Sequence, residues 1–418
     1  MRSTATAEGK TRRRRHAVVA AVAALGVALG VALAIGAGAC GGSGSPAPAA
    51  TVTVTVAPSA SPSASLSPGS SAGATTAQLV VAVASGAHAN GISVISATGR
   101  VKQIVPPSGG PISDLSWAPG GVRLAFLRAV SDTNSTSSLF VYNARRALLY
   151  QVGAGVSPAT IDSYSWVGPT RLIESYFPLG APTYHANGTL YLRDIAKSTG
   201  QVVKDSAGHV VKGVGVSASA DGIRLAFVTY GAKTTGQIAE SLRVYDANNL
   251  GLSTVASGQA PTEADGDQFT YPSISPDGTL VATQQTGSDI GFGITVYGVD
   301  GTKHLQSGAL VWPAPVSWTP HGPRLALGGG PGSSSGEHDS LLVWPAGAAK
   351  ATPIITGVKR PITSLAWTPK GSQIAYAVAQ SSGLQSSLWI VNANGSNRHL
   401  LLSGGSWPAW AVAPIRFP

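Results

Sequence analysis

A short sequence pattern recurs along the chain and restricts its possible folds more than any other feature. The pattern is a Trp or another apolar residue, a short turn that contains Gly, and an apolar strand such as Arg-Leu-Ala-Phe. Clear copies lie at 115–126, 317–327 and 366–376, and weaker ones lie at 166–173, 219–227 and 275–282. A repeat of about 50 residues is the length of one four-stranded propeller blade.

Each copy continues with a second recurring strand of alternating apolar residues. This strand is found at 139–142, 190–193, 242–245, 294–297, 341–344 and 388–391. Short alternating runs that are separated by Asp-Gly or Asn-Gly turns are typical of β-hairpins. The low share of charged residues (11%) and the 52 glycines also disfavour long helices. The chain is therefore predicted to be all-β.

The two ends of the repeat region complement each other. Residues 407–418 start another copy at Trp410, whereas residues 79–106 hold three strands with no first strand before them. Joining the two parts completes one blade and leaves no open sheet edge in the ring. We therefore predict a seven-bladed β-propeller over residues 77–418, closed by N- and C-terminal strands. A six-bladed ring is the alternative, if the divergent copy around Trp166 is irregular.

The first 39 residues have the charge order of an export signal. Arg12 to Arg15 precede an uncharged apolar stretch that runs to Ala39. This order predicts a signal peptide over residues 1–39. The stretch is also long enough to cross a bilayer as an uncleaved anchor. Whether this stretch stays as an uncleaved anchor or is replaced by a lipid anchor after cleavage, the arginines stay in the cytoplasm and the rest of the chain is exported.

The only cysteine, Cys40, follows Ala37-Gly38-Ala39 at the end of the apolar stretch. This arrangement resembles the lipobox of bacterial lipoproteins, in which small residues precede a cysteine that is lipidated and becomes the mature N-terminus. The resemblance implies a signal peptide with a lipobox and a lipid anchor on Cys40 at the outer face of the cell membrane. Simple secretion, with Cys40 incidental, is a further alternative to the uncleaved anchor.

Residues 40–76 form the predicted connection between this anchor and the propeller. After Cys40 they are almost wholly Gly, Ser, Pro, Ala, Thr and Val. Such a stretch cannot offset its ordering entropy by burying apolar surface, so we expect a flexible, disordered linker. The net charge of +10 includes six basic residues from the predicted signal. The remaining mild excess disfavours nucleic acid as a partner.

The repeat, Trp-Ser/Thr-Pro-x-Gly followed by a Leu-Ala-Phe strand, resembles the TolB-like (WD40-like) β-propellers of bacteria. The Asp of that pattern is present only at Asp221 and Asp277, and Gly121, His321 and Lys370 replace it elsewhere. The Ala, Gly and Val content and the lipobox also resemble actinobacterial propeller lipoproteins. The resemblance implies a cell-envelope protein that binds other proteins through its propeller.

The longer loops are expected on one face of the ring, which is suited to binding. The candidate binding residues on this face are Tyr184, His185, Glu263, Asp265, Asp267, Glu337, His338 and Asp339. The alternate acidic residues of 263–267 resemble calcium ligands, but no complete twelve-residue calcium loop is present. No cofactor is therefore predicted, and calcium at this loop or a metal site formed by scattered histidines stays open. The five recurring Trp residues are interpreted as blade-packing residues rather than a sugar platform.

Residues 332–336 match Gly-x-Ser-x-Gly, but they lie between two strands and not at the strand–helix turn that a hydrolase needs. The sequence therefore favours a non-catalytic scaffold that binds an envelope protein or an exported ligand. The alternative is a propeller lyase, lactonase or hydrolase with a site at the mouth of the axial channel. Such an enzyme needs several His, Asp, Glu or Arg side chains that converge there.

Overall fold

The computed structural model describes most of the region predicted to be a propeller. The described residues are 80–85, 89–96, 99–131, 134–152, 159–178, 185–234, 236–261, 269–285, 293–307, 315–329, 339–380 and 386–410. The predicted signal peptide, Cys40 and the linker lie outside these residues. Within them there is no helix, and therefore none that is long and apolar enough to cross a membrane.

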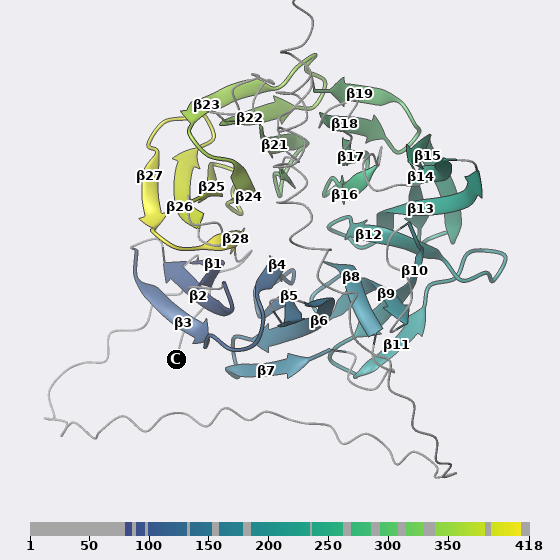
Figure 1. Cartoon of the computed structure of the whole chain (residues 1–418), viewed down its shortest axis with the longest axis horizontal. Coiled ribbons are helices and arrows are strands. Elements are labelled where there is room, and N and C mark those ends of the chain that lie inside the picture. Colours follow the sequence, from purple (N-terminus) through teal and green to yellow (C-terminus); the bar gives the residue numbers. More distant parts are fainter. Residues whose placement is uncertain are drawn as a thin grey trace, which may run out of the picture.

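Five separate antiparallel sheets of four strands lie around a ring (Figure 1). The first contains β28 (Ser406–Trp410), β1 (Val80–Ser85), β2 (Gly91–Ser96) and β3 (Val101–Val105). The second contains β4 (Ile112–Trp117), β5 (Arg123–Ser131), β6 (Asn134–Asn143) and β7 (Leu148–Gln151). The third contains β16 (Thr270–Ile274), β17 (Leu280–Gln285), β18 (Gly293–Gly298) and β19 (Lys303–Gln306).

The other two four-stranded sheets come from the C-terminal part of the chain. One contains β20 (Val316–Trp318), β21 (Arg324–Gly328), β22 (Asp339–Pro345) and β23 (Thr352–Val358). The other contains β24 (Ile362–Trp367), β25 (Gln373–Ala379), β26 (Ser386–Asn392) and β27 (His399–Leu402). In Figure 1 the first strand of each sheet lies toward the centre of the ring and the fourth lies at its rim.

A single eight-stranded sheet occupies the remaining arc of the ring. Its strands are β8 (Ala159–Trp166), β9 (Arg171–Pro178), β10 (Gly188–Asp194), β11 (Thr199–Val202), β12 (Lys212–Ala218), β13 (Arg224–Thr234), β14 (Gln237–Asp246) and β15 (Gly251–Pro261). Strand β10 pairs with β12 only at Gly188–Gly213 and Thr189–Lys212. The fold is thus all-β and propeller-like, as predicted.

Both ends of the described chain meet in the first sheet. Strand β1 pairs antiparallel with β28, with Val81 opposite Trp410 and Ala84 opposite Ser406. The ring is therefore closed by hydrogen bonds between its N- and C-terminal strands. The predicted closure is confirmed.

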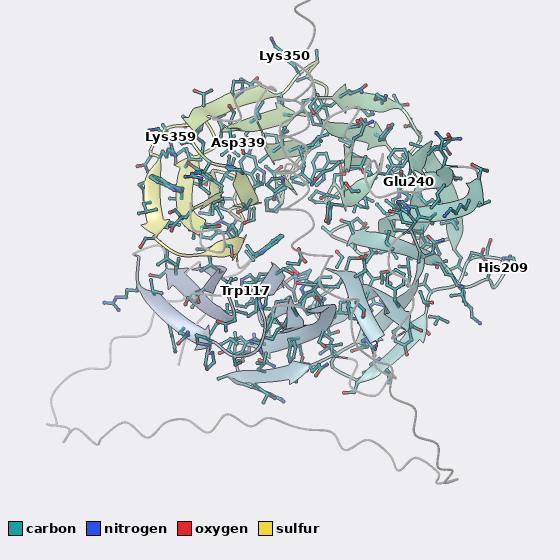
Figure 2. The ribbon with its side chains drawn as sticks, in the orientation of Figure 1. Trp117, His209, Glu240, Asp339, Lys350 and Lys359 are labelled. Carbon is teal, nitrogen blue, oxygen red and sulfur yellow. The ribbon has the colours of Figure 1, made fainter. Side chains whose placement is uncertain are left out.

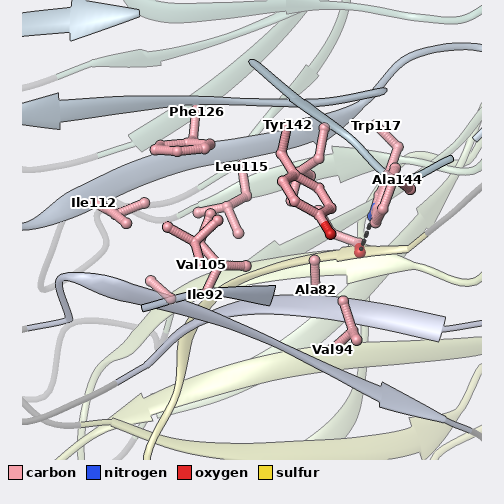
Figure 3. Packing of buried hydrophobic residues seen from close by; sticks show 13 residues of the cluster. Ala82, Ile92, Val94, Val105, Ile112, Leu115, Trp117, Phe126, Tyr142 and Ala144 are labelled. Carbon is pink, nitrogen blue, oxygen red and sulfur yellow. Dashed lines mark hydrogen bonds between the residues drawn. The ribbon is translucent and has the colours of Figure 1, made fainter. Parts of the chain in front are cut away.

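The recurring tryptophans hold neighbouring sheets together. The Trp117 side chain is 7% exposed, and its indole Nε1 donates to the Ala409 carbonyl at 3.1 Å (Figure 3). In Figure 2 it lies toward the centre of the ring. The same bond joins Trp166 to Ser116, Trp318 to Ser273 and Trp367 to Ser317, at 2.9–3.1 Å. These four residues are packing residues, as interpreted from the sequence.

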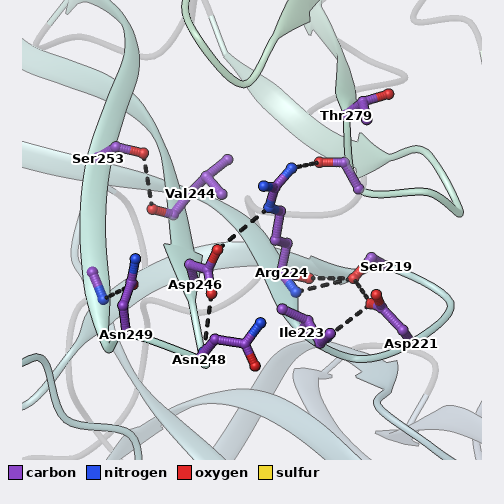
Figure 4. Close-up of polar contacts among 12 residues, drawn as sticks. Ser219, Asp221, Ile223, Arg224, Val244, Asp246, Asn248, Asn249, Ser253 and Thr279 are labelled. Atoms are coloured by element: carbon purple, nitrogen blue, oxygen red, sulfur yellow. Dashed lines mark hydrogen bonds and ion pairs between the residues drawn. The ribbon is translucent and has the colours of Figure 1, made fainter.

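The recurring Arg makes a second kind of link between sheets. The Arg224 guanidinium donates to the Gly278 carbonyl in the next turn at 2.9 Å, and it lies 3.5 Å from Asp246 (Figure 4). Asp221 closes its own turn by accepting the hydroxyl of Ser219 at 2.6 Å. Equivalent bonds join Arg123 to the Pro169 carbonyl and Arg324 to that of Gly371. The repeat therefore encodes contacts between blades as well as strands.

Candidate functional site

β-Bulges interrupt the strands that line the centre of the ring. In six of the seven described innermost strands the register with the neighbouring strand shifts, and only β20 pairs regularly. Four bulged residues have φ between +47° and +65°, and each lies three positions before the repeated Trp position. They are Asp114, Gly215, Tyr271 and Trp407. A bulge changes the direction in which a side chain points.

Three of these bulged residues present large or charged side chains to solvent. Asp114 is exposed, Tyr271 is 68% exposed and Trp407 is 36% exposed. These residues lie on β4, β16 and β28, which Figure 1 places toward the centre of the ring. We call Asp114, Asp162, Tyr271 and Trp407 the inner-strand residues. Asp162 is the exposed, unpaired residue of the bulge in β8.

The backbone of Asp114 is held in its unusual conformation by a residue of the next sheet. Its φ of 53° lies in the left-handed region, which is unfavourable for a residue with a Cβ. The buried hydroxyl of Tyr164 bonds to the Asp114 carbonyl and lies 2.8 Å from the Ala125 carbonyl. Burial raises the pKa of Tyr164, so its hydroxyl keeps its proton. Tyr164 therefore holds the backbone from which the Asp114 side chain projects.

Asp114 and Asp162 come from adjacent arcs of the ring, and the charge of Asp162 acts on Asp114. The pKa of Asp114 is raised, chiefly because surrounding protein limits its hydration although solvent reaches it. A bond from the Ser113 hydroxyl at 3.0 Å opposes that rise, and the charge of Asp162 adds to it. Asp162 accepts the Gly215 amide at 2.9 Å and is thereby fixed in place. A cation placed between the two carboxylates would relieve their repulsion.

Two of the residues predicted to bind lie within the described chain. The ring of His185 is 5.0 Å from that of Tyr230, so it packs against β13. Asp339 is 7% exposed, and its Oδ2 accepts the Ile362 amide at 2.8 Å. Glu240 accepts the Phe269 amide in the same way, and Figure 2 labels both carboxylates. Asp339 therefore joins one sheet to the start of the next.

The other predicted binding residues lie outside the described chain. They are Tyr184, Glu263, Asp265, Asp267, Glu337 and His338. Among the described residues, no group of three or more His, Cys, Asp or Glu side chains could hold a metal ion. The inner-strand residues were not predicted from the sequence. A signal for them exists, because three of them lie three positions before a Trp-equivalent residue, and Asp162 lies four positions before Trp166.

Comparison with known proteins gives a likeness in structure only. No family model matches the chain, and no curated protein does. Oligogalacturonate lyase in complex with manganese superposes with a TM-score of 0.50 and 14% identity, covering 77% of this chain and 84% of the lyase. Hydrazine synthase of Kuenenia stuttgartiensis has a TM-score of 0.51 and 12% identity, covering 73% and 90%. These two likenesses show a shared fold.

TolB, whose repeats this sequence resembles, is also among the similar structures. TolB from Acinetobacter baumannii has a TM-score of 0.44 and 15% identity, covering 81% of this chain and 67% of TolB. Both a TolB and a lyase are thus among the similar structures, and function has to be argued from this chain's own residues.

Proposed function

We propose that this chain is an exported, lipid-anchored, seven-bladed propeller that binds a ligand near the centre of its ring and catalyses no reaction. The count of seven treats the eight-stranded sheet as two blades, β8–β11 and β12–β15. It is supported by the shortness of the β10–β12 pairing, which involves two residue pairs. The proposed anchor is Cys40 at the outer face of the membrane, with residues 1–39 as signal peptide and 40–76 as linker.

The observation that carries the binding proposal is the pair of carboxylates on the innermost strands β4 and β8 of adjacent arcs. The pKa of Asp114 is raised chiefly by desolvation, and the charge of Asp162 adds to this rise. A ligand with an ammonium or guanidinium group would compensate it and form charge-assisted hydrogen bonds. Tyr271 and Trp407 add exposed aromatic rings, which attract cations and apolar groups. We therefore propose a cationic ligand, such as a basic segment of an envelope protein.

Tetralysine is a suitable probe for this site, and fully acetylated tetralysine is its uncharged control. We expect calorimetry to detect saturable binding of tetralysine to the chain and none of the acetylated peptide. In the double variant Asp114→Asn/Asp162→Asn, binding should weaken by about tenfold or more, because charge-assisted bonds are lost. Asp300→Asn, which lies in a rim turn, should bind normally. Equal binding of tetralysine by the parent chain, the double variant and Asp300→Asn would contradict the proposal.

The alternative is an enzyme that uses the same two carboxylates. It is favoured by the raised pKa of Asp114, since acid–base catalysts commonly carry shifted pKa values. A fold shared with oligogalacturonate lyase is consistent with it. Turnover of an oligogalacturonate by the chain, abolished in Asp114→Asn, would establish the enzyme and overturn the non-catalytic role.

The anchor has a separate test in a bacterial host. Cys40→Ser should abolish labelling of the protein by a radioactive fatty acid and release it from the membrane fraction. Continued fatty-acid labelling of this variant would exclude Cys40 as the lipidated residue. Loss of labelling with retention in the membrane would instead indicate an uncleaved anchor.

A further inference from the structure

The short turns of the propeller emerge on one face of the ring. Strands in each sheet are antiparallel, so the turn after the first strand and the turn after the third lie on the same side. We call this side the short-turn face. Among the described residues, its exposed cations are Arg100, Arg145, Arg146, Arg171, Lys197, Lys303, Lys350, Lys370 and Arg398, and its half-buried ones are Arg123, Arg224 and Arg324.

The carboxylates of the short-turn face are engaged within their own turns. Five acidic residues lie there among the described residues: Asp194, Asp221, Asp246, Asp277 and Asp300. Each accepts a backbone amide of its own turn at 2.9–3.2 Å. Hydrogen bonds hold the pKa of Asp277 and Asp300 below the ordinary value. With twelve cations against five carboxylates, the described part of this face is positively charged.

The chain also enters the propeller on this face. Val81 lies opposite Trp410, which occupies the same repeat position as Trp117. Trp117 leads directly into the short turn that precedes Arg123, so Trp410 and the start of β1 are at the short-turn face. Residues 1–79, which include the apolar stretch and Cys40, are therefore joined to the ring on its positive side.

We infer that the short-turn face rests on the anionic headgroups of the membrane that holds the N-terminal segment. This inference relies on the anchoring in the proposed function. Negative lipid surfaces attract nearby Lys and Arg side chains, and this attraction acts within about 10 Å at 0.1 M salt. The linker of residues 40–76 would keep the ring close to that surface. The effective concentration of the short-turn face near the headgroups is then high, so even weak attraction of each cation contributes. The opposite face, with Lys212, Lys233 and Lys359, is turned outward.

Lysine acylation can test this orientation in the full chain. The protein would be reconstituted into vesicles of phosphatidylcholine alone, or of phosphatidylcholine with phosphatidylglycerol. Mass spectrometry then compares the acylation rates of lysines on the two faces, which serve as mutual controls. On anionic vesicles the short-turn lysines 197, 303, 350 and 370 should react at least about threefold more slowly, because the surface shields them. The acylation rates of Lys212, Lys233 and Lys359 on the opposite face should not change, and high salt should remove the protection.

Two charge-reversal variants provide a matched comparison. Arg145→Glu/Arg146→Glu changes a turn that is held by the side-chain oxygen of Asn143, so the turn itself should persist. This variant should lose most of the protection, whereas Lys233→Glu/Lys359→Glu should retain it. Protection of the opposite lysines, or equal rates on both vesicles, would overturn the inference.

Flotation of the vesicles separates failure of the anchor from failure of the orientation. Flotation with both vesicle types but no selective protection leaves the anchor and overturns the orientation. Flotation with anionic vesicles alone, with the short-turn lysines protected, supports the orientation and overturns the anchor. Failure of the protein to float with either type of vesicle would overturn both the anchor and the orientation.

Discussion

At the scale of single residues, Asp114 combines an unfavourable backbone with an unfavourable charge. Its raised pKa means that folding favours the protonated form, so the ionised carboxylate costs stability above that pKa. That cost disappears as the pH falls toward the ordinary value of 3.8. Functional sites commonly lower the stability of a protein in this way while no ligand is bound.

Asp114→Asn should therefore be more stable than the parent protein at pH 7. Asn tolerates the left-handed backbone, so only the charge is lost. The difference in free energy of unfolding between this variant and the parent protein, measured with urea, should narrow as the pH falls from 7 to 4. Asp277→Asn is the control with the opposite sign, because hydrogen bonds lower the pKa of Asp277. This control should be less stable at pH 7, and its difference should narrow only below about pH 4. A pH-independent difference for Asp114→Asn would contradict the raised pKa.

The repeated Trp position offers a second comparison between single residues. Trp318 donates its Nε1 proton to the Ser273 carbonyl, whereas the buried Nε1 of Trp410 has no hydrogen-bond partner in the described part of the chain. Trp318→Phe should lower the free energy of unfolding by about 2 kcal/mol or more, because a carbonyl loses its donor and the packing loosens. Trp410→Phe should cost less in the same denaturation experiment. A larger loss at Trp410 would show that the bond between sheets is not what makes this position important.

At the scale of strands, the sequence predicts the strand pairs that recur in each repeat, and it misses the bulges and pairings that lie outside the repeat. The strand pairs follow from the recurring 115–126 type of segment, which becomes β4 and β5. The bulges are less predictable, because the residue at that position is Asp, Gly, Tyr or Trp and so has no common chemistry. The β10–β12 pairing was not predicted either, since it depends on two glycines outside the repeat pattern.

Gly213 in strand β12 leaves no room for a side chain. A Cβ there would lie 2.3 Å from Phe227 Cδ2 and 2.8 Å from the Val228 carbonyl oxygen. Gly213→Ala should therefore force β12 away from β13 and lower the free energy of unfolding by about 1–3 kcal/mol. Gly404→Ala, where no atom lies within 4 Å of the added carbon, should be close to neutral. Similar unfolding midpoints for the two variants would argue against this close approach.

At the scale of the whole molecule, stability depends on a ring closed by the last described strand. Strand β28 pairs with β1, and its Ala409 carbonyl accepts the indole proton of Trp117 from the following sheet. A chain that stops at Gly405 loses both contacts and exposes the edge of β1. We expect it to unfold at a lower denaturant concentration, with an additional transition, or to associate through the open edge. A chain that stops at Trp410 keeps every described strand and should unfold like the full protein. If both truncated chains unfold alike, closure by the two termini is not what holds the ring together.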